Sequence, residues 1–88
     1  ADVAVLGTNG LTVEHGLTTP DLAEAAVKQA IIAASHRVVV LADHTKLGRV
    51  DLARVAPLAA VDTLVTDSGV DAAVAAEVEE AGVRVVLS

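Results

Sequence analysis

Three short polar segments, each placed after an apolar run, contain the residues of this sequence that could do chemistry. The first, Gly7–Gly10, is Gly-Thr-Asn-Gly, and its glycines would let backbone N–H groups approach an anionic or hydroxyl-rich ligand. In the second, Lys46 suits a phosphate or carboxylate, and Asp43 suits the hydroxyls of a sugar. In the third, Thr66–Ser68, Asp67 is a further candidate to accept hydrogen bonds from hydroxyls.

Each segment also has a purely structural interpretation, which the residues leave open. Asn9 and Gly10 suit a tight turn, the second segment suits a surface turn with a local ion pair, and the third suits a helix cap. Glu24 and Lys28 stand four residues apart in a predicted helix, a spacing that favours an exposed ion pair. Glu24 would serve as a general base only if that helix faced the site.

Composition excludes several classes of function. The net charge of −6 over 88 residues argues against the chain itself holding a nucleic-acid backbone, and the lack of aromatic residues removes base stacking. The chain has no cysteine, and its histidines (His15, His36 and His44) lack metal-ligand spacing, so we expect neither metal nor cofactor. No serine has the context of a hydrolase nucleophile. No apolar run is long enough to span a membrane, which favours a cytoplasmic protein.

Short valine-rich runs alternate with helical stretches, a pattern that predicts an α/β fold with an open, mostly parallel sheet of about four strands. The predicted strands cover residues 3–6, 37–42, 63–66 and 83–87. One helix is expected from an N-cap at Thr19, with Pro20 in its first position, to Ser35, and another from about 70 to 81. Residues 7–19 are expected to form a loop, and residues 50–60 are ambiguous, with a short helix before Pro57 as one option.

The helices have recognisable faces and ends. In the first, a broad apolar face is made by Leu22, Ala26 and Ala30, with Val27, Ile31 and Ala34 beside them. In the second, Ser68 and Asp71 have the spacing of a capping box, and Gly82 fits the position after the helix. Ligands of such folds bind outside the carboxyl ends of the strands, where all three polar segments are predicted to lie.

Most of the apolar residues are small, since alanine and valine dominate, so the core that this chain can build is modest. The chain also starts at Ala1, without methionine and close to an apparent strand. Both features lead us to expect either a fragment or an obligate oligomer.

Four motifs, in order and in register, resemble the carboxy-terminal sensor domain of the DeoR family of bacterial transcriptional regulators. The resemblance runs from Ala1 almost to Ser88. It is carried by the stretches Asp2–Thr12, Gly16–Pro20, Glu24–Ala30, Leu41–Gly48 (LADHTKLG) and Val65–Asp67.

The resemblance implies a regulator, expected to be a repressor, of carbohydrate operons. Such proteins bind operator DNA through an amino-terminal winged helix-turn-helix, and their sensor binds a phosphorylated sugar or related metabolite. The sensor is similar in fold to ribose-5-phosphate isomerase, glucosamine-6-phosphate deaminase and the CoA transferases. In that comparison the Asp43–Lys46 turn looks like an Asp-x-Ser-Lys segment, and Glu24 falls near a catalytic glutamate. The implied effector-binding residues are Gly7, Thr8, Asn9, Gly10, Glu24, Asp43, Lys46 and Asp67.

A complete sensor of this family is longer, so residues 1–88 resemble its second half. We therefore expect a chain that does not bind DNA itself, has an incomplete ligand site, and forms homo-oligomers that cover exposed apolar surface. One alternative is a sugar-phosphate isomerase of the same fold, with Glu24 as base and Lys46 as electrostatic stabiliser. A second alternative is an oligomerisation module that binds no ligand.

Overall fold

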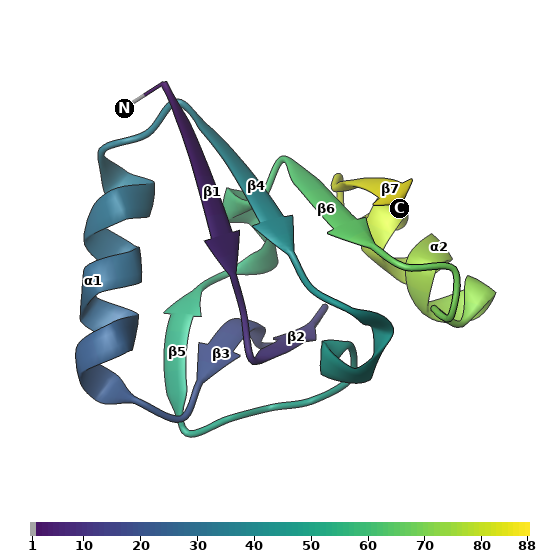
Figure 1. Cartoon of the computed structure of the whole chain (residues 1–88), viewed down its shortest axis with the longest axis horizontal. Helices are drawn as coiled ribbons and strands as arrows, with labels where there is room; N and C mark the ends of the chain where they lie inside the picture. The colour runs from purple at the N-terminus through teal and green to yellow at the C-terminus, as the bar shows by residue number, and fades with distance from the viewer. Residues whose placement is uncertain (1) are drawn as a thin grey trace.

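The computed structural model describes residues 2–88, which fold into two sheets and two helices (Figure 1). The larger sheet is fully parallel, with strand order β1-β4-β6-β7, and the smaller is antiparallel, with order β2-β3-β5. The larger sheet consists of β1 (Val3–Gly7), β4 (Arg37–Leu41), β6 (Thr63–Thr66) and β7 (Arg84–Leu87). The smaller consists of β2 (Gly10–Thr12), β3 (Gly16–Thr19) and β5 (Ala53–Ala56). The helices are α1 (Leu22–Ala33) and α2 (Ala72–Glu80), with single 3-10 turns η1 (His44–Lys46) and η2 (Leu58–Ala60). The predicted α/β class and four-stranded parallel sheet are confirmed.

The register of the parallel sheet brings the carboxyl ends of its strands to one edge. Gly7 pairs with Leu41, and Leu41 pairs with Val65. In Figure 1 the arrowheads of β1, β4 and β6 all point towards the half of the molecule that holds the small sheet. The polar segments that follow these three strands therefore start side by side, as the sequence predicts.

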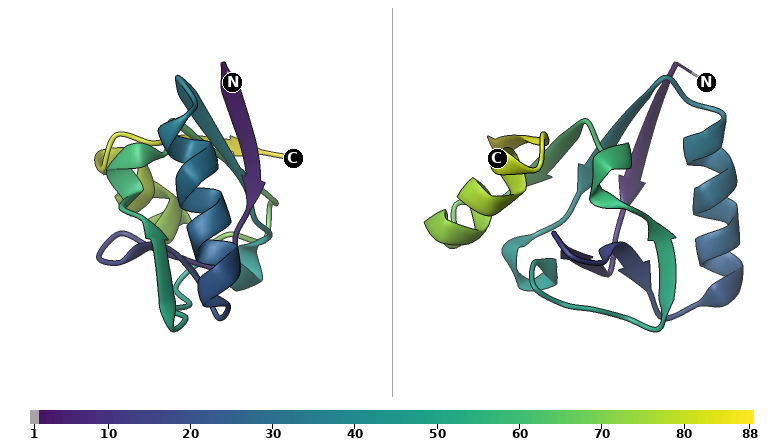
Figure 2. Two further views of the ribbon diagram at one scale, coloured as in Figure 1. Left: turned by 90° about the vertical axis from the view of Figure 1, so that its left-hand side faces the viewer. Right: turned by 180° about the vertical axis from the view of Figure 1, so that it is seen from behind.

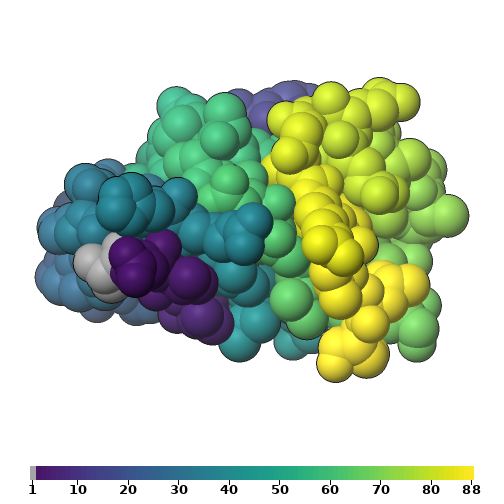
Figure 3. All heavy atoms as spheres, turned by 90° about the horizontal axis from the view of Figure 1, so that it is seen from above, coloured from purple at the N-terminus to yellow at the C-terminus, as the bar shows by residue number. Residues whose placement is uncertain are grey.

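Only one face of the parallel sheet is covered. Alternate residues of its strands are buried against the helices and the small sheet; these are Ala4, Leu6, Val38, Val40 and Leu64. Residues on the opposite face stay exposed, including Val3, Val5, Leu41 and Val86. Seen from above, β1 (purple) and β7 (yellow) lie on opposite sides of the teal residues of β4 (Figure 3). Parallel sheets are ordinarily covered on both faces, so this apolar surface is unusual.

The small sheet departs from the prediction. The expected loop over residues 7–19 contains β2 and β3, and the ambiguous stretch over 50–60 holds β5 and η2 rather than a helix before Pro57. The three strands are only three or four residues long and depend on one another, because β3 pairs with both β2 and β5. Such pairing is decided by contacts between distant residues, which local sequence does not reveal.

Both helices begin later than predicted, each at an aspartate. The carboxylate of Asp21 accepts hydrogen bonds from the backbone N–H groups of Ala23 (2.8 Å) and Glu24 (3.3 Å), so Asp21 is the N-cap of α1. The predicted cap, Thr19, is instead the fully buried last residue of β3, and Pro20 precedes the helix.

Asp71 caps α2 in the same way, because its carboxylate accepts a hydrogen bond of 2.8 Å from the N–H of Ala73. The predicted capping box of Ser68 and Asp71 is therefore wrong, since Ser68 lies in the turn before the cap. The helix ends before Gly82, as expected.

The apolar face of α1 points outwards. Leu22 is 70% exposed, Val27 59% and Ile31 39%, and Ala25 is the one buried residue of the helix. Figure 2 shows α1 standing beside β1, β3 and β5, which are the strands it contacts. Gln29 is exposed, and its amide donates to the Arg54 carbonyl at 2.9 Å. The helix therefore packs through Ala25 and Ile32 rather than through its predicted apolar face, and Gln29 adds a hydrogen bond to β5.

Candidate functional site

The segments after β4 and β6 are joined by the carboxylate of Asp67. Its Oδ2 accepts a hydrogen bond from the backbone N–H of His44 at 3.1 Å. Its Oδ1 lies 2.8 Å from Nδ1 of the same histidine and accepts a second hydrogen bond, also 2.8 Å, from the N–H of Gly69. Asp67 thus fixes the turn after β4 against the turn after β6, and the sequence-predicted residues Asp43 and Asp67 belong to one cluster.

Both carboxylates of this cluster are held in the ionised form. The pKa of Asp43 is lowered, first by the hydroxyl of Thr45, with the Thr45 backbone N–H and the charge of Lys46 also contributing. The pKa of Asp67 is lowered, first by the N–H of His44 and then by that of Gly69. Lys46, at the end of η1, supplies positive charge beside them. The cluster presents hydrogen-bond acceptors together with one cation, which suits hydroxyl recognition.

The segment after β1 divides into structural and accessible residues. Thr8 is buried, and its hydroxyl donates to the carbonyls of Gly10 (2.9 Å) and Thr18 (3.3 Å). Gly10 is needed for packing, because a Cβ at this position would collide with the Arg49 carbonyl. These two residues therefore shape the turn.

Gly7 and Asn9 are more accessible than Thr8 and Gly10. Asn9 is half-buried, and its Oδ1 accepts a hydrogen bond of 3.3 Å from the hydroxyl of Thr19. Gly7 is exposed, and a Cβ built there would meet nothing nearer than the Leu41 carbonyl at 4.0 Å. A ligand can approach the carboxyl end of β1 at these two residues.

A second cation at this edge, Lys28, is one that the sequence did not single out as a site residue. Its ammonium lies 2.9 Å from Glu24 Oε1 and donates a hydrogen bond of 2.7 Å to the Gly7 carbonyl, at the end of β1. The predicted exposed pair is right for Glu24, which is 46% exposed, and wrong for Lys28, which is 15% exposed. The sequence carries no signal for this burial, because a lysine off the predicted apolar face would be expected in solvent.

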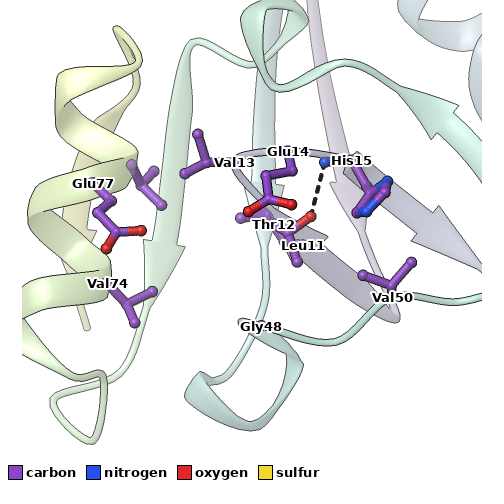
Figure 4. Close-up of a pocket in the computed structure, with 10 residues that line it drawn as sticks. Leu11, Thr12, Val13, Glu14, His15, Gly48, Val50, Val74 and Glu77 are labelled. Carbon is purple, nitrogen blue, oxygen red and sulfur yellow. Dashed lines mark hydrogen bonds between the residues drawn. The ribbon is translucent and has the colours of Figure 1, made fainter.

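The two cavities near these elements differ in their relation to the predicted site. A groove of about 330 Å³ runs between the 11–15 turn and α2, with a floor of leucine and valine and with Glu14 and Glu77 among its lining residues (Figure 4). None of the predicted site residues lines it. A smaller cavity of about 160 Å³ is lined by His44, Gly69 and Asp71, among others, and adjoins the Asp67 cluster.

Residues 2–88 are the part of the chain that the structure describes. None of their helices is both long and apolar enough to cross a membrane. They contain no group of three or more histidine, cysteine, aspartate or glutamate residues placed to hold a metal ion.

Comparison with known proteins identifies relatives along nearly the whole chain. The chain is 45% identical over 97% of its length to the HTH-type transcriptional regulator GlpR of Haloferax volcanii. It is 31% identical over 97% of its length to the HTH-type transcriptional regulator GolR of Listeria innocua. It is 38% identical over 75% of its length to the HTH-type transcriptional repressor GlcR of Bacillus subtilis.

The chain covers 33%, 34% and 25% of these three relatives, respectively, so it spans about a third of their length or less. The family model described as the DeoR C terminal sensor domain matches residues 1–68, a range that contains all three polar segments of the sheet edge. Together, the fold, the converging strand ends and these matches place the chain in the DeoR C-terminal sensor domain family.

Proposed function

We propose that the chain is the effector-sensing part of a transcriptional regulator, a repressor of carbohydrate metabolism, and that it binds a phosphorylated sugar or related metabolite. One observation carries the proposal: polar segments distant in sequence converge at the carboxyl edge of the parallel sheet, where ligands of such folds bind. The names of the relatives support a regulatory role, since each of the three is a transcriptional regulator or repressor.

The ligand's phosphate is held by Lys46 and by backbone N–H groups of the Gly7–Gly10 segment. Its hydroxyls donate to Asn9, Asp43 and Asp67. The carboxylates of Asp43 and Asp67 accept hydrogen bonds and therefore suit hydroxyls. The same two negative charges would repel a phosphate unless Lys46 contacts it directly. The proposed ligand therefore has separate anionic and hydroxyl-bearing ends.

In the intact protein, ligand binding changes the affinity of a helix-turn-helix domain, outside residues 1–88, for operator DNA. The ligand favours one arrangement of the subunits over another, and this arrangement moves the two DNA-binding domains relative to the spacing of the operator half-sites. A coupling free energy of about 1–3 kcal/mol is typical of such linkage.

We propose binding rather than catalysis for this site. The isomerase alternative requires Glu24 as a free base, but its carboxylate pairs with the ammonium of Lys28 at 2.9 Å. The relatives are named as regulators, which also favours binding.

We further propose that the chain forms homo-oligomers through the uncovered face of the parallel sheet. Val5, 59% exposed, lies on this face and pairs in register with Val39. Sedimentation equilibrium should give a mass above that of the monomer, and Val5→Lys should lower it. A monomeric mass for the unmodified chain would refute this proposal.

The test of the sensor proposal is thermal melting of the full-length protein with glucose 6-phosphate, fructose 6-phosphate and ribose 5-phosphate. A ligand at 100 times its Kd should stabilise the protein by about 2.7 kcal/mol. Lys46→Ala should abolish the shift. Arg84→Ala should preserve it, because Arg84 begins β7 and so lies at the opposite edge of the sheet. If none of a wider set of phosphorylated metabolites shifts the melting of folded protein, the phosphate assignment is wrong.

A further inference from the structure

We propose that His44 is a ligand contact, which accepts a hydrogen bond at Nε2 from a hydroxyl of the sugar, and that Asp67 positions its ring. The sequence points to no role for His44, because the three histidines lack metal-ligand spacing. The inference rests on the proposed function, because it assigns a further residue to the same ligand.

The imidazole of His44 is held from two directions. Asp67 binds both the backbone N–H and Nδ1 of this residue, at 3.1 and 2.8 Å, so the main chain and the ring are fixed by one carboxylate. On another side the ring packs against Gly69, where a Cβ would lie 2.6 Å from Nδ1 and 2.8 Å from Cε1. Any other residue at position 69 would have to displace the ring. A side chain confined in this way is prepared for a specific contact.

The partner of Nδ1 determines what the other ring nitrogen can do. A carboxylate that stays ionised accepts a hydrogen bond, so the neutral imidazole carries its proton on Nδ1 and its lone pair on Nε2. Within residues 2–88, Nε2 of His44 has no hydrogen-bond partner. The side chain is 48% exposed and lines the cavity of about 160 Å³ next to the cluster. Nε2 is therefore an accessible acceptor at the proposed site.

The charges around the ring select the kind of ligand atom. Asp67 faces Nδ1, Asp43 precedes His44 in the chain, Lys46 ends the same turn, and Asp71 lines the same cavity. The three carboxylates outnumber the ammonium beside the ring, so a phosphate is disfavoured at Nε2, whereas Lys46, at the end of the turn, stays available to it. A neutral hydroxyl meets no such repulsion and supplies the donor that Nε2 lacks. His44 thus recognises the carbohydrate part of the ligand.

Two substitutions separate ligand contact from structural support. His44→Asn places an amide N–H near the position of Nδ1 and can retain the bond to Asp67, but it has no atom at the position of Nε2. His44→Gln reaches towards the position of Nε2 and loses the Nδ1 bond. If His44 contacts the ligand, His44→Asn should weaken sugar-phosphate binding by about tenfold, which is roughly the loss of one hydrogen bond. His44→Gln should weaken the binding less. A purely structural role predicts the reverse order.

The experiment is calorimetric titration of the full-length protein and both variants. The probes are whichever of glucose 6-phosphate, fructose 6-phosphate and ribose 5-phosphate binds, and inorganic phosphate, which has no carbohydrate hydroxyl. His44→Asn should weaken the sugar phosphate and leave inorganic phosphate unchanged. In the free protein, long-range ¹H–¹⁵N correlation spectra should show the proton of neutral His44 on Nδ1.

The outcomes separate the role of His44 from the sensor function. Sugar-phosphate affinity unchanged in His44→Asn, or a proton found on Nε2, overturns the role of His44 and leaves the sensor function standing. If no sugar phosphate binds the unmodified protein, the proposed function fails and the role of His44 fails with it.

Discussion

The contact between Lys28 and the end of β1 predicts that Lys28 stabilises the fold well beyond an ordinary surface ion pair. The informative substitution is Lys28→Met, which removes the ammonium and keeps an apolar stem of similar length. It deletes two interactions at once: the 2.7 Å hydrogen bond to the Gly7 carbonyl and the 2.9 Å ion pair with Glu24.

The two interactions differ in expected size. A hydrogen bond involving a charged group is worth about 1.5–3 kcal/mol, and the lower end applies here because Gly7 is exposed and water can replace the lysine. The ion pair is worth at most about 1 kcal/mol, because Glu24 is 46% exposed. Lys28→Met should therefore lower the free energy of unfolding by about 1.5–2.5 kcal/mol, and for a domain of this size each kcal/mol lowers Tm by about 4–8 °C.

The assay is urea denaturation of the full chain followed by far-ultraviolet circular dichroism. Glu24→Gln is the matched control, because it removes the ion pair and leaves the Gly7 bond; it should cost no more than about 1 kcal/mol. If Lys28→Met costs no more than Glu24→Gln, the hydrogen bond to β1 contributes nothing measurable and the reasoning is wrong.

Three further predictions test other parts of the structure. Gly10→Ala should lower the free energy of unfolding by about 2 kcal/mol or more, because its Cβ would meet a backbone carbonyl, whereas Gly7→Ala should cost about 1 kcal/mol or less; urea denaturation compares them. The lowered pKa values of Asp43 and Asp67 mean that their stabilisation is complete above the ordinary value of 3.8 and is lost as the pH falls through the lowered values of the folded state. Urea midpoints should accordingly fall in this acidic range, and less steeply in Asp67→Asn. Ile31→Lys should change the free energy of unfolding by no more than about 0.5 kcal/mol, because the side chain points outwards; a loss of several kcal/mol would place it in an interface.

The parallel sheet could be predicted from sequence because its strands are short valine-rich runs with helical or turn-forming residues between them. The small sheet could not, because Gly10–Thr12 and Gly16–Thr19 have no alternating apolar pattern of useful length. Their pairing with β5 makes them strands, and that partner lies more than thirty residues away from β3 in sequence. Local propensity is a weak guide when the pairing strand is distant.

Several residues of the site could be predicted from the sequence, but the contacts between them could not. Asp43 and Asp67 could be placed at strand ends from the sequence, since each follows an apolar run. That Asp67 binds His44 depends on β6 lying beside β4, which sequence order does not specify. Lys28 could not be predicted as a residue of this edge, because its spacing from Glu24 predicts the ion pair but not which side of α1 packs against the sheets. Strand order and helix orientation were the missing facts.

The order of the strands also gives the proposed site a direction. Across the edge come β1 with Gly7 and Lys28, then β4 with Asp43 and Lys46, then β6 with Asp67. Both lysines belong to the β1–β4 side, whereas the β6 side contributes the carboxylate of Asp67, which reaches the imidazole of His44 in the turn after β4. Because a phosphate is stabilised by cations and a hydroxyl by acceptors, we expect the ligand to lie along this edge with its phosphate towards β1 and its hydroxyls towards β6. Substitutions on the two sides should then differ in kind: those near β1 should weaken every phosphorylated ligand alike, and those near β6 should change which sugar is preferred.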